Sequence, residues 1–456
     1  MQRLNNLNNM TVGNPVRLIL RFSLPLMLGS TFQQLYTSVD TLIVGRGVGM
    51  EALAALGTVD WLNWMLFAIA LGFSQGFAVR ISQKFGEGDI PGLKKVIGLS
   101  ARQSIFIAIL ITAGSLLLLP VFLRLLHVPN ELRAMASLYA RILYIGLPGV
   151  IFYNFCSSVL RAVGDSQTPL RAMVIASLTN IVLDCVAVFV LHTGIAGAAV
   201  ATVLSQVLSG VICAVKMWQT PELSIGWSDL RRSGHENVTL FRLGAPIALK
   251  NILISVGGMV MTTVANGFST AFIAGFTATN KLYGLMEIAA LSYSYAVTTY
   301  VGQNYGAGRT DRIRSGIRSA FFLSLATAVG FTAILLLFGR PITRLFISSP
   351  DPAQSAMAAE TAWQYLCYMA CFLPALYTLY SFQACLQGLG KTIFSTFSSL
   401  IELTCRVSVA LIAGYLGSHT LLFAAEIVSW AAGAVFFVIS YFALRRTLLP
   451  PTAESL

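Results

Sequence analysis

Long apolar stretches recur along almost the whole chain, and they restrict its fold more than any other feature. Windows of about 20 apolar residues, the length that crosses a bilayer as a helix, occur twelve times. Only 11% of the residues are charged, against roughly 25% in soluble proteins. We therefore expect an all-α polytopic membrane protein with twelve transmembrane helices. The expected spans are residues 16–40, 52–76, 96–120, 136–160, 169–191, 195–217, 243–266, 271–300, 316–339, 361–386, 393–414 and 419–443.

Lysine and arginine are distributed unevenly between the two ends of these spans. Of the 30 basic residues, 21 fall on the side of the N-terminus, six on the opposite side, and three within spans. Because cytoplasmic loops are rich in lysine and arginine, both termini are expected in the cytoplasm, with the protein in the cell (inner or plasma) membrane. This topology also explains the net charge of +12. No nucleic-acid partner is expected, since no basic cluster lies on a soluble domain.

The two halves of the chain resemble each other at three places. The matching pairs are "FSLPLML" with "LGAPIAL" (Pro25 with Pro246), "QKFGEGD" (83–89) with "QNYGAGR" (303–309), and "LRAVGDSQTP" (160–169) with "LQGLGKTIF" (386–394). Six spans per half is an even number, so the halves share one orientation and form parallel repeats. We expect two six-helix bundles around a central cavity, related by a pseudo-twofold axis along the membrane normal. The expected segments are an N-terminal lobe (1–217), a cytoplasmic loop (218–242) and a C-terminal lobe (243–456).

The glycine-rich segments of the repeat do not indicate nucleotide binding. Neither "KFGEGD" nor "NYGAGR" follows a strand, and neither has the spacing of a dinucleotide or Walker motif. Tight cytoplasmic turns are the expected structures. With no ATP-binding motif in the sequence, any pumping is expected to use an ion gradient.

An aspartate, Asp40, lies inside the first span, in the stretch "QQLYTSVDTLIVG". A charged side chain there costs roughly 3 kcal/mol on insertion scales, and acids within spans are functional by default. Tyr36 shares a helix face with Asp40, and Asp184 with Asn180 forms a similar stripe in the fifth span. The positions of the second half that are equivalent to the two aspartates are uncharged: Met261 corresponds to Asp40, and Ala410 corresponds to Asp184. This difference favours a functional site specific to the first half, although purely structural aspartates bonded to neighbouring hydroxyls are the alternative.

The second half has its own charged residues within spans. Glu402 and Arg406 are four residues apart, the spacing of an ion pair on one helix face. For Glu287, structural and functional interpretations remain open. Lys250 either lines the cavity or extends towards the cytoplasmic interface.

Taken together, these motifs identify a family. "LPLMLGSTFQQLYTSVDTLIVGRGVGMEALAALG", "LRAVGDSQTPL" and "YVGQNYGAGR", with twelve spans and a long central loop, resemble the bacterial multidrug and toxic compound extrusion (MATE) transporters. The resemblance implies export of amphipathic, often cationic compounds coupled to entry of H⁺ or Na⁺, with no other cofactor. The positions that match the family's first-half acidic cluster are Asp40, Asn180, Asp184 and Thr202, with Tyr36 and Asn154 as neighbours and Pro25 as the bending proline. Another branch of the family uses acids in spans seven and ten, which this sequence lacks.

A coupling mechanism follows as a hypothesis. Burial and repulsion both disfavour two charged carboxylates in one pocket, so a proton or a Na⁺ held with Asn180 and Thr202 would neutralise it. That change would repack the first span and bend it at Pro25, but the residues do not choose between H⁺ and Na⁺. No other metal is expected, and the protein is expected to act as a monomer in the lipid bilayer. Aromatic and methionine side chains that suit apolar cations are the candidates for the substrate cavity: Phe32, Phe152, Tyr153, Met259, Met261, Tyr283, Met286 and Tyr377.

Three other functions are weighed against this one. A lipid or oligosaccharide-lipid flippase shares the two-bundle plan, but it would require a strongly cationic cavity. A membrane enzyme would require a catalytic motif, and the four histidines all lie at span ends or in loops. A passive channel would not accumulate its substrate against a gradient. We therefore expect a transporter and not an enzyme.

Overall fold

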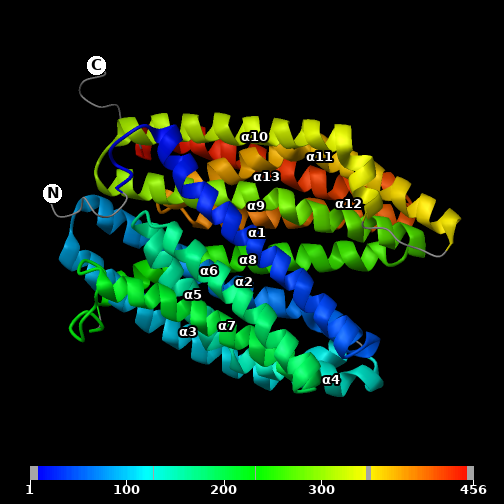
Figure 1. Cartoon of the computed structure of the whole chain (residues 1–456). Coiled ribbons are helices and arrows are strands. Elements are labelled where there is room, and N and C mark those ends of the chain that lie inside the picture. The colour runs from blue at the N-terminus through cyan, green and yellow to red at the C-terminus, as the bar shows by residue number, and fades with distance from the viewer. Residues whose placement is uncertain (1–8, 127, 232, 346–350, 449–456) are drawn as a thin grey trace. The chain divides into compact units, whose positions relative to one another are not determined.

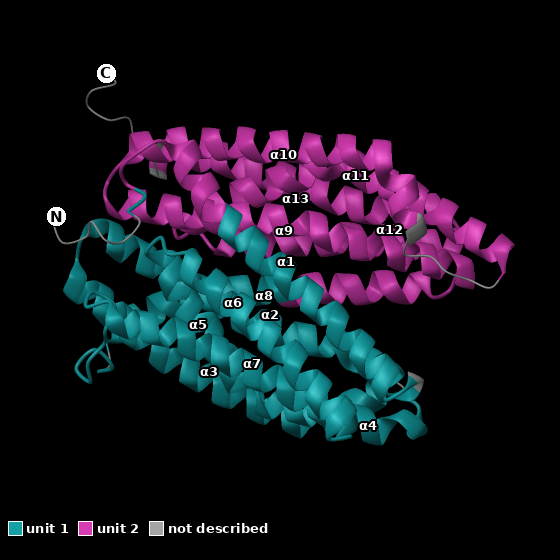
Figure 2. Ribbon diagram, viewed as in Figure 1, with its two compact units in different colours: residues 1–10, 24–251 teal, residues 11–23, 252–456 magenta. Residues whose placement is uncertain are grey.

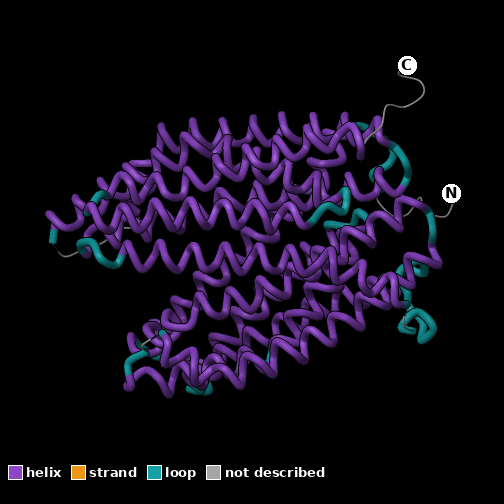
Figure 3. The backbone as a smooth tube through the Cα atoms, turned by 180° about the vertical axis from the view of Figure 1, so that it is seen from behind, coloured by secondary structure: helices purple, strands orange, loops and turns teal. Residues whose placement is uncertain are grey.

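The computed structural model describes residues 9–126, 128–231, 233–345 and 351–448, and this part of the chain contains helices and no strand (Figures 1 and 3). The helices follow one another through short turns. Their bounds are α1 Pro15–Gly47, α2 Met50–Glu87, α3 Ile90–Leu125, α4 Asn130–Ile145, α5 Leu147–Ala162, α6 Gln167–Cys185, the π-helical turn η2 Val186–Val190, α7 Gly194–Gln219, α8 Gly234–Ala265, α9 Thr270–Gly306, α10 Thr310–Leu345, α11 Pro352–Gly388, α12 Ile393–Leu416 and α13 His419–Leu448.

Each of the twelve expected spans lies in one of these helices or in two consecutive ones. Span four is a bent pair, α4 and α5, which meet at Gly146 with an angle of 42°. Span five continues from α6 into η2. Among the described residues, nine helices are long and apolar enough to cross a membrane, and the bent pair makes ten. The remaining two, α1 and α9, are 33 and 37 residues long, so the all-α, twelve-span architecture is confirmed.

The turns of the internal repeat have the same backbone conformation in both halves. Gly88 and Gly308 have φ of 73° and 69°, and Gly164 and Gly390 have φ of 89° and 77°. These values lie in the left-handed region, which glycine adopts without steric cost. Each pair also makes equivalent hydrogen bonds: the amides of Gly88 and Gly308, for example, both donate to the carbonyl three residues earlier. The glycine-rich segments are therefore helix-ending turns.

The chain forms two compact units, and two helices contribute to both of them (Figure 2). Unit 1 contains residues 9–10 and 24–251, and unit 2 contains residues 11–23 and 252–456, apart from the undescribed residues. The start of α1 therefore belongs to unit 2 and its remainder to unit 1. For α8 the assignment is reversed, because its residues up to Asn251 belong to unit 1.

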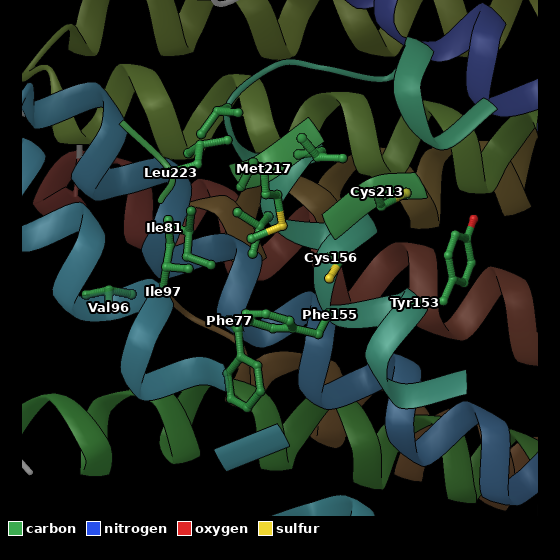
Figure 4. Close-up of a cluster of buried hydrophobic side chains, with 14 of the residues drawn as sticks. Phe77, Ile81, Val96, Ile97, Tyr153, Phe155, Cys156, Cys213, Met217 and Leu223 are labelled. Carbon is green, nitrogen blue, oxygen red and sulfur yellow. The ribbon is translucent and has the colours of Figure 1, made fainter. Parts of the chain in front are cut away.

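Unit 1 is built around two hydrophobic clusters. The first, here called the Phe77 cluster, joins α2, α3, α5 and α7 through side chains such as Phe77, Ile97, Phe155 and Met217 (Figure 4). The second, the Tyr144 cluster, joins α2, α4 and α7 and includes Val44 of α1. Burial of these large apolar side chains stabilises the bundle where they contact other helices instead of lipid.

Unit 2 has an aromatic core. Phe276 stacks on Tyr365 with ring centroids 5.1 Å apart, and Tyr365 stacks on Phe423 at 4.7 Å. These rings come from α9, α11 and α13, so a single stack ties three helices together. Offset aromatic pairs of this kind add stability beyond their buried area.

Within unit 1, α2 and the first part of α8 approach each other closely at small residues. A Cβ atom on Gly72 would lie 2.5 Å from the Cα of Ala248, and one on Gly76 would lie 2.3 Å from the Cα of Gly244. On each helix the two small residues are four positions apart, so they form one stripe. Small residues with this spacing let transmembrane helices pack backbone to backbone.

This crossing predicts a position-specific loss of stability. Gly76→Ala places its new methyl group against the α8 backbone and is expected to cost roughly 1–3 kcal/mol, as overpacking does. Gly57→Ala on the same helix is the matched control, because a Cβ at Gly57 has no neighbour within 4 Å among the described residues. Thermal unfolding in detergent should therefore show a lower midpoint for Gly76→Ala alone. Equal midpoints would contradict the close crossing.

Candidate functional site

The candidate site of unit 1 forms where α1 packs along α6 and η2. Gly29 of α1 faces Leu170 at the start of α6, and Gly47 at the end of α1 faces Val188 of η2. A Cβ on Gly47 would lie only 2.2 Å from a methyl carbon of Val188, so a side chain there would push the two segments apart. Asp40 of α1 thus lies opposite the end of α6, where η2 begins directly after Cys185. Short π-helical turns inside helices occur frequently at functional sites.

Asp40 and Asp184 come together at this contact. Asp184 is fully buried and Asp40 is 9% exposed, and their carboxyl groups are close enough to interact with each other. Two ionised carboxylates have no proton to share and repel each other. A hydrogen bond between them therefore requires one proton, and a bound cation would relieve the same repulsion.

Several other polar atoms around the pair have no partner. Among the described residues, no hydrogen bond reaches either atom of the Asn180 amide group or the Ser177 hydroxyl, and the same holds for one oxygen of Asp40 and both oxygens of Asp184. Asn180 and Ser177 are themselves buried on the same face of α6 as Asp184. Buried polar groups are nearly always hydrogen-bonded, because leaving them unpaired costs about 1–3 kcal/mol each. This concentration of unpaired oxygens is what a small cation or a proton would use.

The position of Asp40 between two hydrophobic clusters explains its burial. Tyr36, one helical turn before Asp40, packs against the Phe77 cluster. Val44, one turn after it, belongs to the Tyr144 cluster. A residue between them on the same face of α1 is shielded from solvent by both clusters. Tyr36 and Asp40 therefore share one face of α1, as predicted from the sequence, and the Asp40 carboxylate lies between the two clusters.

Two residues near the pair were not singled out from the sequence. Tyr139 of α4 is buried and close enough to Asp40 and Asp184 to interact electrostatically with both. Asp60 of α2 is a third carboxylate within range of Tyr139, and its side chain is exposed. Asp60 could have been found by the rule that identified Asp40, since it is also an acid inside an expected span. Tyr139 gave no comparable signal, because one tyrosine on an apolar helix is unremarkable.

The contacts of the other predicted first-half residues are with neighbours outside the pair. The amide of Gln206 on α7 is 3.4 Å from the hydroxyl of Tyr36 and donates to it. Thr202, also on α7, is half-buried on a helix that packs along α6. The Asn154 amide donates to the carbonyl of Val150 in its own helix at 2.9 Å. The roles of Thr202 and Asn154 as ion ligands therefore stay predictions.

In unit 2, the structure corrects the expected Glu402–Arg406 ion pair. The ion pair that it shows joins Arg406 to Glu426 of α13, with 2.9 Å between nitrogen and oxygen. Arg406 also donates to Ser429, and Glu402 accepts a hydrogen bond from Ser398 at 2.6 Å. Glu402 remains an electrostatic neighbour of Arg406. Four-residue spacing put Glu402 on the correct face, but a carboxylate on the adjacent helix α13 reaches the guanidinium directly.

The other charged candidates also have polar contacts. Glu287 of α9 is half-buried and accepts a hydrogen bond from the hydroxyl of Tyr380 at 2.6 Å. Lys250 is buried and has an interaction partner. Its neighbour Asn251 donates to the carbonyl of Ala68 at 2.7 Å.

The residues proposed for a substrate cavity are divided between the two units. In unit 1, Phe32 is exposed, Tyr153 is buried in the Phe77 cluster, and Phe152 lines a groove between α3, α5 and α7. In unit 2, the Tyr377 hydroxyl donates to the carbonyl of Met286 at 2.9 Å, and both side chains are buried. The remaining three are Met261, which is buried, Met259, which is half-buried, and Tyr283, which stacks on Trp430. Their role in substrate binding stays a prediction.

Comparison with known proteins decides the family. The family model for MatE matches residues 25–186 and 246–412, which is most of both halves. The chain belongs to the MATE transporter family. The two matched segments begin at Pro25 and Pro246, the pair that also opened the internal repeat.

Individual relatives of this MATE transporter agree with the family model. It is 31% identical to "Probable multidrug resistance protein YpnP" of Bacillus subtilis over 367 residues, which cover 80% of each chain. Its structure matches that of a MATE protein in complex with MaL6 with a TM-score of 0.90, 24% identity, and 97% and 98% of the two chains covered. A MATE protein in the bent conformation matches with a TM-score of 0.87 and 25% identity, covering 97% of this chain and 98% of that one.

These findings confirm several expectations. The MATE assignment, the twelve-span fold with two bundles and the multi-pass membrane location are confirmed, and the relatives are transporters and not enzymes. The coupling ion, the substrates and the orientation in the membrane are matters for the proposal below.

Proposed function

We propose that this MATE transporter exports amphipathic, often cationic compounds in exchange for H⁺ or Na⁺, and that the Asp40–Asp184 pair is the coupling site. The observation on which the proposal rests is the contact between two buried carboxyl groups whose polar neighbours lack partners among the described residues. The name of the Bacillus relative, a probable multidrug resistance protein, supports the substrate class.

One positive charge is enough to change this site. A proton shared by Asp40 and Asp184 would convert the repelling pair into a hydrogen-bonded one. A Na⁺ would be held by carboxylate oxygens and the carbonyl oxygen of Asn180, since hard cations prefer oxygen ligands. In both cases the α1–α6 contact differs between the loaded and empty states, and a ligand shifts a conformational equilibrium only through such a difference.

Pro25 would transmit this change along α1. It lies 15 residues before Asp40, or about 22 Å along the helix at 1.5 Å per residue. It also lies next to the point where α1 passes from unit 2 to unit 1, between Ser23 and Leu24. Proline supplies no backbone donor inside a helix and so permits a kink. A MATE protein that is 25% identical has been solved in a bent conformation.

The direction of transport rests on the distribution of basic residues. The excess of lysine and arginine on one side supports an orientation with both termini in the cytoplasm and the protein in the cell (plasma or inner) membrane. Aromatic and methionine side chains such as Phe32, Tyr36 and Met259 would contact the substrate, and one chain would be the functional unit. The flippase alternative gains no support, because the Bacillus relative is named as a multidrug resistance protein.

The test is transport of a fluorescent lipophilic cation in vesicles that contain the purified protein. An inward H⁺ gradient and an inward Na⁺ gradient are imposed separately, with protein-free vesicles as the control. One of the two gradients is expected to drive extrusion of the dye against its concentration difference. Movement of dye only down its own gradient, whichever ion is supplied, would exclude the proposed antiport.

A further inference from the structure

Unit 2 has a groove between α10, α11 and α13 that the proposed transport mechanism does not use. Its volume is about 710 Å³. Its floor is aromatic: Phe321 of α10 lies 5.7 Å from Phe382 of α11, and Phe382 lies 5.3 Å from Tyr441 of α13, between ring centroids. The groove is thus an apolar channel between helices, large enough for a hydrocarbon chain.

Three arginines line this groove. Arg314 and Arg318 come from successive turns near the start of α10, and Arg445 from the last turns of α13. All three side chains are exposed. The guanidinium of Arg445 lies 4.8 Å from the ring centre of Phe442, and that of Arg318 lies 5.9 Å from the ring centre of Phe322. Cation–π contacts of this kind orient a guanidinium without neutralising its charge.

The groove is lined by more basic than acidic side chains. Among the described residues that line it, three are arginines and none is an aspartate or glutamate. The sequence contains no aspartate or glutamate in α10 after Asp311 or in α13 after Glu426. Asp311 lies 3.9 Å from Arg309, and Glu426 is paired with Arg406. The groove therefore combines an apolar floor with a cluster of cations, a combination that fits an anionic amphiphile.

We propose that this groove binds an anionic phospholipid, with its phosphate at Arg318 and Arg445 and an acyl chain along the aromatic floor. A lipid is favoured over a free anion because α10 and α13 are both long apolar spans whose exposed side chains, such as Phe322 and Ile439, suit a hydrocarbon environment. The arginines lie at the helix ends rich in basic residues, which the positive-inside rule assigns to the cytoplasmic leaflet. Anionic lipids bind to basic pockets between transmembrane helices on that side.

Unit 1 shows that a bundle of this kind does not require the arginines. Its groove between α3, α5 and α7 occupies the equivalent place, because these are the third, fourth and sixth spans of their half. That groove has a volume of about 530 Å³, and no charged residue lines it. Residues 223–225 of the chain after α7 also line it. Of these two grooves, as the described residues line them, that of unit 2 carries the cationic cluster, and one such lipid site per chain is expected.

The experiment compares binding of two lipids to the full-length protein in detergent. Phosphatidylglycerol and phosphatidylcholine are titrated separately, and bound lipid is counted by native mass spectrometry. The double variant Arg318→Gln/Arg445→Gln is expected to bind one phosphatidylglycerol about thirtyfold more weakly than the unmodified protein, taking the usual contribution of each cation. Its phosphatidylcholine binding should be unchanged. Equal phosphatidylglycerol affinity in the variant and the unmodified protein would overturn the proposal.

Two further variants make the result specific. Arg124→Gln/Arg340→Gln removes the same charge from exposed arginines at the opposite ends of α3 and α10, and phosphatidylglycerol affinity should be retained. Arg318→Lys/Arg445→Lys keeps the charge and should restore most of the affinity. Glycerol phosphate in millimolar excess is expected to displace little lipid. Complete displacement would show a site for free anions and refute the lipid assignment.

Discussion

Asp40→Asn and Asp184→Asn are each expected to reduce gradient-driven export to the level of protein-free vesicles. Asparagine nearly preserves the shape of the side chain, but it neither takes up a proton nor balances a cation. Without that exchangeable charge, the ion has no difference in affinity between the two conformations of the transporter. It therefore cannot shift the equilibrium between them. The measurement is extrusion of the fluorescent cation under the gradient that drives the unmodified protein. Exchange of dye without an ion gradient, at a rate above that of protein-free vesicles, should persist in both variants, which separates lost coupling from lost folding.

Two other carboxylates serve as controls for this result. Glu51 is exposed near the start of α2, so Glu51→Gln should leave export unchanged. Glu287→Gln in unit 2 should also retain gradient-driven export, because the Glu287 carboxylate already has a hydrogen-bond donor in Tyr380. Export that survives in both aspartate variants but fails in Glu287→Gln would move the coupling site to the second half.

Arg406→Gln is expected to lower the stability of unit 2 strongly, and by more than the other substitution compared here, Arg340→Gln. The guanidinium is 5% exposed and pairs with Glu426 at 2.9 Å. Removing one partner of a buried ion pair leaves an uncompensated charge and typically costs about 3–5 kcal/mol. The expected result is a lower yield of folded protein and a lower thermal midpoint in detergent.

An exposed ion pair in the same unit provides the comparison. Arg340 and Glu360 are 3.4 Å apart with more than half of each side chain accessible, and such pairs contribute only about 0–1 kcal/mol. Arg340→Gln should therefore leave the thermal midpoint almost unchanged. The double variant Arg406→Met/Glu426→Leu should recover part of the loss, since it removes both charges together. If the double variant were as unstable as Arg406→Gln, the loss of stability would not come from an uncompensated charge.

The fold could be predicted from sequence because its signals are long and repeated. A stretch of 20 apolar residues has few alternatives to a membrane span, and the matched turns around Gly88 and Gly308 occur at nearly the same distance from the prolines that open the two halves. The breaks inside spans were not predicted. The bend at Gly146 and the π-helical turn after Cys185 involve single residues or one turn, and hydropathy windows average over such lengths.

The candidate site was only partly predictable, for a different reason. Asp40 and Asp184 could be paired because a charge inside a span is rare enough to be informative. Glu426 was missed as the partner of Arg406 because contacts between helices depend on their rotation and vertical register. A spacing of four residues predicts which side chains are neighbours on the same helix. It does not predict which side chains of the adjacent helix they contact. The same limit applies to Tyr139, whose closeness to both aspartates depends on where α4 lies against α1 and α6.

Because α1 and α8 are each divided between the two compact units, these units do not coincide with the two halves of the chain. A cut in the connection between α7 and α8 would give a first fragment without residues 234–251 of unit 1 and a second fragment without residues 11–23 of unit 2. Neither fragment would contain a complete module. The two halves of this protein, although they share one repeating pattern, would each depend on the other to complete a unit.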